Sequence, residues 1–218
     1  MLVRRNYHDQ RRKQIKEEVL EILANINQMM QMFDNFLLHP TAENKNIILE
    51  NEDFIDKHEK KTEKYIIEII SLEQLDTTEI KWLFSMGRII RELERAGDQL
   101  ANIVTISDMI DTVEFRPLVR EFFHYEQEMI NWLIIGINDD KEDKLEAVIH
   151  HDEHVNELNK ETYQHMAKLI KKKANFTENQ LKMVIISRFL ERMGDHLVNA
   201  ARAYKETVFF YNGAGTKK

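Results

Sequence analysis

The chain has 218 residues and a formal net charge of -7, with 6 glycines, 2 prolines and no cysteine. Because turn-forming residues are so scarce, this composition predicts a few long elements and disfavours a β-sandwich or an α/β fold. The acidic charge disfavours nucleic-acid binding, which depends on Lys and Arg neutralising phosphates. The missing cysteines exclude disulfides and thiolate metal sites. No run of about 18 apolar residues occurs, so we expect a cytoplasmic protein without an integral membrane segment.

Apolar residues recur every three or four positions along nearly the whole chain, which predicts amphipathic helices. In chain order, the predicted helices cover about residues 11–38, 42–72, 77–107, 118–137, 142–173 and 178 to just before 213. His39 and Pro40 end the first helix, and Asp76 and Thr177 offer capping side chains for the third and the sixth. Both prolines, Pro40 and Pro117, are expected to lie between helices.

The second half of the chain repeats the first. The segment 91–102 matches 188–199 with eight of twelve residues identical, at a constant offset of 97. Apolar residues upstream of both segments fall in the same register, so both helices are expected to bury the same stripe. We therefore predict an all-α fold of two tandem three-helix bundles related by internal duplication. The expected domains are residues 1–110 and 111–218, divided within the irregular segment 108–117.

Each repeat carries a pair of carboxylates on one helix face. Glu94 and Asp98 are four residues apart, which places them about 6 Å apart along the helix axis and on the same side. Glu191 and Asp195 repeat this spacing in the second half. Two carboxylates this close repel each other unless a cation neutralises them, and oxygen ligands suit Mg²⁺, Ca²⁺, Mn²⁺ or iron. A solvated helix face and ion pairs with the adjacent arginines are the open alternatives.

Gly97 and Gly194 stand inside the two motif helices, where a glycine costs about 1 kcal/mol relative to alanine. Close approach of a neighbouring helix explains them, and access of a ligand to the flanking acids is the alternative.

A second polar set lies in the second and fifth predicted helices: Glu52, Asp53, Asp56, Glu59, Asp152, Glu153, Asn156 and Glu157. The histidines that offer nitrogen ligands nearby are His58, His150, His151 and His154.

The two Leu-Glu-Arg-x-Gly-Asp segments at 93–98 and 190–195, with Ile55 and Asp56 upstream, closely resemble the PhoU family of phosphate-signalling proteins. The resemblance covers nearly the whole chain and implies one three-helix bundle in each half, with metal ions bound by E/D-x-x-x-D motifs. The metals implied are divalent or trivalent ions such as iron, zinc, magnesium or manganese. Carried over to this chain, the metal ligands are Glu94, Asp98, Glu52 and Asp56, then Glu191, Asp195 and Asp152.

One position departs from the family pattern. Asn156 stands where the fifth helix usually carries an aspartate, and a neutral amide is a weaker ligand for a hard cation. The second metal site is therefore expected to be weaker than the first.

The resemblance also implies a function. PhoU proteins are regulators rather than enzymes: they restrain phosphate uptake by the high-affinity transporter and damp phosphate-starvation signalling. The implied partners are the ATPase subunit of the phosphate transporter, the phosphate-sensing histidine kinase and a second copy of the chain in a homodimer.

Two other functions are compatible with a helical bundle. A di-iron carboxylate enzyme needs two Glu-x-x-His motifs, and the sequence holds only Glu121 with His124. A histidine phosphotransfer bundle would use His58, but Glu63 replaces the proline expected in that motif, and we expect this segment to be an exposed helix face. No glycine-rich loop for phosphate is present, so no direct phosphate site is predicted.

Overall fold

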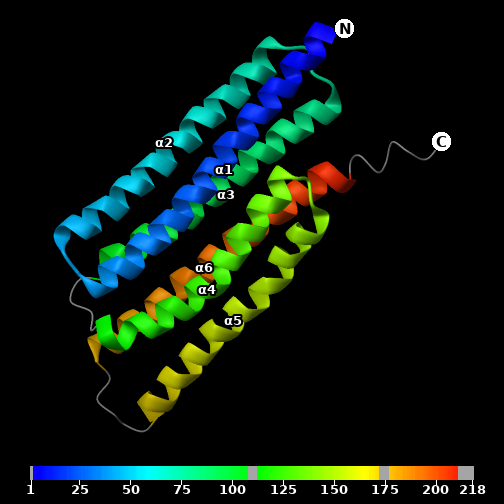
Figure 1. Cartoon of the computed structure of the whole chain (residues 1–218). Coiled ribbons are helices and arrows are strands. Elements are labelled where there is room, and N and C mark those ends of the chain that lie inside the picture. Colours follow the sequence, from blue (N-terminus) through cyan, green and yellow to red (C-terminus); the bar gives the residue numbers. More distant parts are fainter. Residues whose placement is uncertain (1, 108–111, 172–176, 211–218) are drawn as a thin grey trace.

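The computed structural model describes residues 2–107, 112–171 and 177–210, and this part of the chain is helical apart from short connections. The elements are α1 (Leu2–Leu38), α2 (Ala42–Leu72), α3 (Thr77–Ile106), α4 (Thr112–Asn138), α5 (Glu142–Lys171), α6 (Glu178–Lys205) and a short π-helix, η1 (Glu206–Phe210). Figure 1 shows α1, α2 and α3 in one elongated bundle, with α4, α5 and α6 in a second bundle beside it. The prediction of an all-α fold with two tandem three-helix bundles is confirmed.

Local capping explains where several helices begin. The hydroxyl of Thr41 accepts a hydrogen bond from the backbone N–H of Asn44 at 3.2 Å, and so caps α2. Asp76 caps α3 in a capping box, in which the side chain of Glu79 accepts from the backbone N–H of Asp76 at 2.8 Å. Thr177 caps α6 in the same way. Each cap satisfies backbone N–H groups that have no partner within the first turn.

Pro117 lies inside α4, so the expectation that both prolines fall between helices is wrong for this one. The proline stands near the start of the helix, where its missing N–H removes only one backbone hydrogen bond. The neighbouring Arg116 anchors this end of α4 to α1, since its guanidinium donates to both carboxylate oxygens of Asp34 at 3.0 and 2.9 Å.

The proposed domain boundary between residues 110 and 111 lies outside the described residues and stays a prediction, as does the predicted end of the fifth helix at 173.

The two bundles meet along α3 and α6, which run antiparallel at the centre of the molecule, while α1 lies against α4 (Figure 1). The repeated apolar stripe is buried in both halves: Met86, Ile89 and Leu93 on α3, and Met183, Ile186 and Leu190 on α6. Buried residues of both halves form one continuous hydrophobic cluster. The relative placement of α3 and α6 is therefore fixed by burial of apolar surface.

Polar contacts across the same junction set its register. Glu92 of α3 is buried and accepts hydrogen bonds from Nδ1 of His196 at 2.9 Å and from the side-chain amide of Asn199 at 3.1 Å, both on α6. The hydroxyl of Ser85 donates to the backbone carbonyl of Ala203 at 2.8 Å. Among the described residues, no helix combines the length and apolar character needed to cross a membrane.

Candidate metal centres

The first half brings five acidic side chains together where α2 faces α3. They are Glu52, Asp56 and Glu59 on α2, with Glu94 and Asp98 on α3. Burial raises the pKa of Glu94 to about 7, helped by the charges of Asp98 and Glu59. Burial also raises the pKa of Glu52, which lies within hydrogen-bonding reach of Asp98. Such shifts arise where carboxylates are buried and lie close together without enough positive charge to balance them.

Basic side chains neutralise only the rim of this first cluster. Nζ of Lys60 lies 2.6 Å from the carboxylate of Asp56, and the guanidinium of Arg91 lies 4.0 Å from Glu59. Both basic side chains are more than half exposed. Arg95, which is adjacent to the motif, pairs with Glu92 at 3.7 Å instead. The ion pair of Arg95 is thus with Glu92 and not with a motif acid, although its charge opposes the rise in the pKa of Glu94.

The two motif glycines allow close approach of the neighbouring helix. A Cβ atom built on Gly97 would lie 3.1 Å from Cδ1 of Ile55 on α2. A Cβ atom on Gly194 would lie 3.0 Å from Oδ1 of Asp152 and 3.3 Å from Cγ1 of Val155 on α5. Helix packing accounts for the glycine in the first half. In the second half the close neighbours are likewise side chains of the facing helix, one of them the carboxylate of Asp152. Access of a ligand to the flanking acids stays a prediction.

The second half brings Asp152 on α5 next to Glu191 and Asp195 on α6. Burial raises the pKa of Asp152 to about 6, and the charge of Asp195 adds to this rise. The side-chain amide of Asn156 donates to Oδ2 of Asp152 at 2.8 Å, whereas Oδ1 of Asp152 is buried without a hydrogen-bond partner. The asparagine that departs from the family pattern thus holds the aspartate in place.

Arginines surround the second cluster more closely than the first. Arg188 forms a short ion pair with Glu191, so here a basic side chain does neutralise one motif acid. A surface depression of about 630 Å³ opens onto Asp152 and Asp195, and arginines including Arg192 line it. The second cluster is therefore accessible from the surface but has fewer free carboxylates than the first.

Sequence reasoning missed one acidic residue of the second half. Glu126 of α4 has an exposed fraction of 0 %, and neither of its carboxylate oxygens has a hydrogen-bond partner. Burial, and then the charge of Asp152, raise its pKa well above the ordinary value. A signal was present in the sequence, because Glu126 occupies a core position between Phe122 and Met129 in the apolar stripe of α4.

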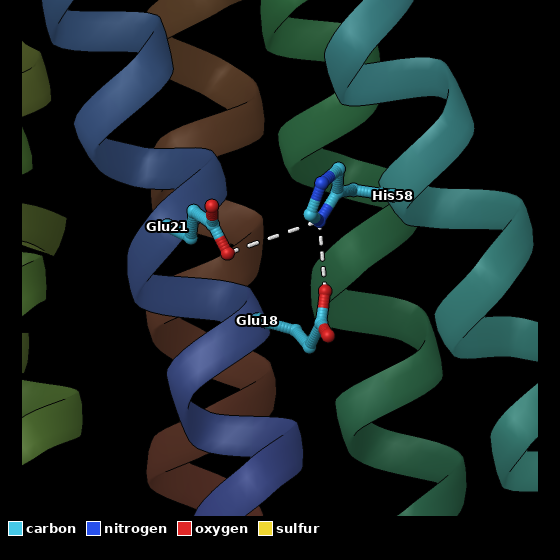
Figure 2. A group of neighbouring side chains, drawn as sticks. All are labelled: Glu18, Glu21 and His58. Carbon is cyan, nitrogen blue, oxygen red and sulfur yellow. Dashed lines mark hydrogen bonds and ion pairs between the residues drawn. The ribbon is translucent and has the colours of Figure 1, made fainter.

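His58 does not join the acidic cluster between α2 and α3. Figure 2 shows its ring directed from α2 toward Glu18 and Glu21 of α1. Nδ1 of His58 lies 2.7 Å from Glu18 and 4.0 Å from Glu21, while Lys61 donates to the other oxygen of Glu18 at 2.7 Å. The ring also stacks on Phe54, with centroids 4.0 Å apart. His58 is therefore half-buried, and the expectation of an exposed helix face is wrong for this residue.

Among the described residues, Glu18, Glu21 and His58 are the only group of three or more metal-type side chains whose ligand atoms all lie within 4.8 Å of one another. Lys61 forms an ion pair with Glu18, and the ring of His58 lies within hydrogen-bonding distance of the same carboxylate, so these contacts within the protein account for the group. The carboxylates of the motif clusters are more widely spread.

Within the described part of the chain, the predicted ligands His150, His151 and His154 form no hydrogen bond or ion pair with the motif acids. Nε2 of His151 lies 2.9 Å from the carboxylate of Glu128, and the ring of His154 stacks on Tyr125 with centroids 5.2 Å apart. His150 is exposed. The motif donors that the structure brings together are therefore carboxylates, which fit hard cations better than zinc with its preference for nitrogen and sulfur.

The rival di-iron reading finds no support in the geometry. Glu121 and His124 are both exposed and line a surface groove with residues such as Leu38 and Pro117. Di-iron carboxylate bundles instead project their Glu-x-x-His ligands inward from facing helices.

Comparison with known proteins identifies the family. The sequence model of the PhoU domain matches residues 19–107 and 119–203. A protein of Borreliella burgdorferi named "Phosphate-specific transport system accessory protein PhoU homolog" is 27% identical over 182 residues, which are 78% of this chain and 81% of the relative. "Phosphate-specific transport system accessory protein PhoU homolog 1" of Methanothermobacter thermautotrophicus is 23% identical over 195 residues, 88% of this chain and 89% of the relative.

Solved structures share the fold. The crystal structure of PhoU from Pseudomonas aeruginosa has a TM-score of 0.78 and 18% identity, covering 92% of this chain and 98% of that one. The phosphate transport system regulatory protein PhoU from Streptococcus pneumoniae has a TM-score of 0.77 and 15% identity, covering 93% and 97%. With the domain matched once in each half, the chain belongs to the PhoU family.

Proposed function

We propose that this chain is an accessory protein of a phosphate-specific transport system, and that it restrains phosphate uptake and phosphate-starvation signalling through protein contacts. The observation that supports this most strongly is the PhoU domain match in both halves, together with relatives named for that transport system. In this proposal the protein is cytoplasmic, forms a homodimer and is a regulator rather than an enzyme.

The proposed contacts are with the ATPase subunit of the transporter and with the phosphate-sensing histidine kinase. A tagged copy of the full chain should retain each of these proteins from cell extracts or in a two-component reconstitution. Size-exclusion chromatography with light scattering tests the homodimer. Failure to retain either protein under these conditions would contradict the proposed mode of action.

The acidic clusters are proposed to bind metal ions. Glu52, Asp56, Glu94 and Asp98 would hold one centre, and Asp152, Glu191 and Asp195 the other. The raised pKa values of Glu94 and Asp152 support this, because burial and then a neighbouring carboxylate raise them, and a bound cation would offset both effects. The donor set suits magnesium, manganese or iron, with zinc a poorer match.

A genetic experiment tests the regulatory proposal. Deletion of the gene should leave starvation genes expressed and phosphate uptake high in phosphate-rich medium, and the intact chain should reverse both effects. Glu94→Ala/Asp98→Ala tests whether the first centre is needed for that reversal. Glu50→Ala, at an exposed position on α2, serves as the control. Normal repression in the deletion strain would refute the proposed function.

A further inference from the structure

The helices of the two halves correspond residue by residue. Because Gly97 faces Ile55 and Gly194 faces Val155, α2 matches α5 at an offset of 100. The same offset relates α1 to α4, where the paired positions are buried: Val19 with Val119, Ile22 with Phe122, Met29 with Met129, and Phe33 with Leu133. Ile26 then pairs with Glu126. Both are fully buried, so a core isoleucine of one half is replaced by a carboxyl group in the other.

A second difference between the halves concerns the acidic clusters. At the same offset, Asp56 and Glu59 of α2 correspond to Asn156 and Asn159 of α5. The second cluster therefore loses two carboxylates on α5 and gains one in the core, on α4. Asn159 is buried, and its side-chain oxygen has no hydrogen-bond partner among the described residues.

Glu126 is costly to the fold as it stands. A buried carboxyl without a hydrogen-bond partner loses its interactions with water and gains none in return. Unpaired polar groups in a core are rare and call for a cause, which a bound ion supplies. The one charge that contributes to the pKa shift of Glu126 is that of Asp152, and Oδ1 of Asp152 is also buried and unpaired. The chain neighbours of these two residues, Tyr125 and His151, have ring centroids 5.4 Å apart, so α4 and α5 pack against each other where the two unpaired carboxyl groups lie.

We infer that Glu126 is a ligand of the second metal centre, supplied from the core by α4 and acting with Asp152. This inference rests on the proposed metal binding of the second cluster. It assigns the second centre a ligand that the first half does not have, because Ile26 occupies the corresponding position there. A centre reached from three helices would compensate for the carboxylates that Asn156 and Asn159 do not provide.

The test uses the full chain carrying Glu94→Ala/Asp98→Ala, so that the first centre is removed, and titrates it with Mn²⁺ in a calorimeter. Adding Glu126→Gln or Glu126→Ile should weaken Mn²⁺ binding at least about tenfold, the usual cost of losing a metal-site partner. Glu121→Gln, an exposed position on the same helix, should leave the affinity unchanged. Urea unfolding of the metal-free variants checks that each is folded, and Glu126→Ile should unfold at a higher urea concentration than its parent.

The outcomes distinguish failure of Glu126 as a ligand from failure of metal binding at the second cluster. If Glu191→Ala/Asp195→Ala abolishes Mn²⁺ binding in this background while both Glu126 variants keep the parent affinity, Glu126 is not a ligand although the second centre exists. If the background chain binds no Mn²⁺ at all, the second metal centre and the role of Glu126 are both refuted.

Discussion

Replacing Glu94 with glutamine should stabilise the metal-free protein at pH 8 and have little effect near pH 5. Burial and the neighbouring Asp98 raise the pKa of Glu94 from 4.5 to about 7. The carboxyl therefore binds its proton more tightly in the folded chain than in the unfolded chain. Its contribution to stability is fully present below about pH 4.5 and is lost as the pH rises through about 7.

The structure sets the size of this effect. A pKa rise from 4.5 to about 7 corresponds to about 3 kcal/mol of differential stabilisation if the side chain is fully shielded. Glu94 is only partly buried, so solvent screening reduces the expected difference to about 1–2 kcal/mol. Glutamine has nearly the same shape and stays neutral, so it removes the repulsion without leaving a cavity.

The assay is urea unfolding with a chelator present, at several pH values between 5 and 8. The difference in the free energy of unfolding between Glu94→Gln and the parent chain should grow with pH across this range. Glu50→Gln, at an exposed site on α2, should show no such trend. Parallel stability curves for Glu94→Gln and the parent would show that Glu94 does not lie under electrostatic strain in the folded chain.

Two further predictions concern packing and the second cluster. Gly136→Ala would place its Cβ 2.6 Å from Cδ2 of Leu145, where α4 turns into α5, and should lower the free energy of unfolding by about 1–3 kcal/mol. In Gly87→Ala the new Cβ meets only ordinary contacts, and the substitution should raise the free energy of unfolding by up to about 1 kcal/mol because alanine favours the helix. Thermal unfolding measures both variants. A higher stability for Gly136→Ala than for Gly87→Ala would contradict this packing. Asn156→Asp should tighten Mn²⁺ binding at the second cluster and destabilise the metal-free chain, because the hydrogen bond to Asp152 is replaced by repulsion. Calorimetry and urea unfolding test both parts, and unchanged Mn²⁺ affinity would show that the side chain at position 156 does not reach the metal.

Periodicity predicts most of the fold because each helix buries a continuous apolar stripe. The predicted bounds of the second helix, 42 and 72, are those observed for α2, where Thr41 supplies the cap. Pro117 shows the limit of local rules. Its preference for a helix boundary is overridden near the start of α4, where the ion pair between Arg116 and Asp34 holds the turn against α1. That contact joins residues distant in sequence, so no local pattern reveals it.

Some features of the candidate site could be predicted from the sequence, whereas others depend on how the helices pack. The i, i+4 spacing places Glu94 and Asp98 on one face without any knowledge of the partner helix. The direction of His58 could not be predicted, because α2 has α1 on one side and α3 on another, and only packing decides which one the ring meets. Glu126 was visible as an acid in an apolar stripe, but its proximity to Asp152 depends on how α4 and α5 pack.

The metal content of the purified protein shows whether the two acidic motifs bind metal. Elemental analysis of the gently purified protein, with Glu94→Ala/Asp98→Ala and Glu191→Ala/Asp195→Ala alongside it, reports how many ions each motif retains. We expect bound metal in the parent chain and a partial loss in each variant, with the larger loss from the first half because its cluster holds more free carboxylates. Metal content that is the same in the parent and in both variants would contradict the assignment of these motifs as metal sites.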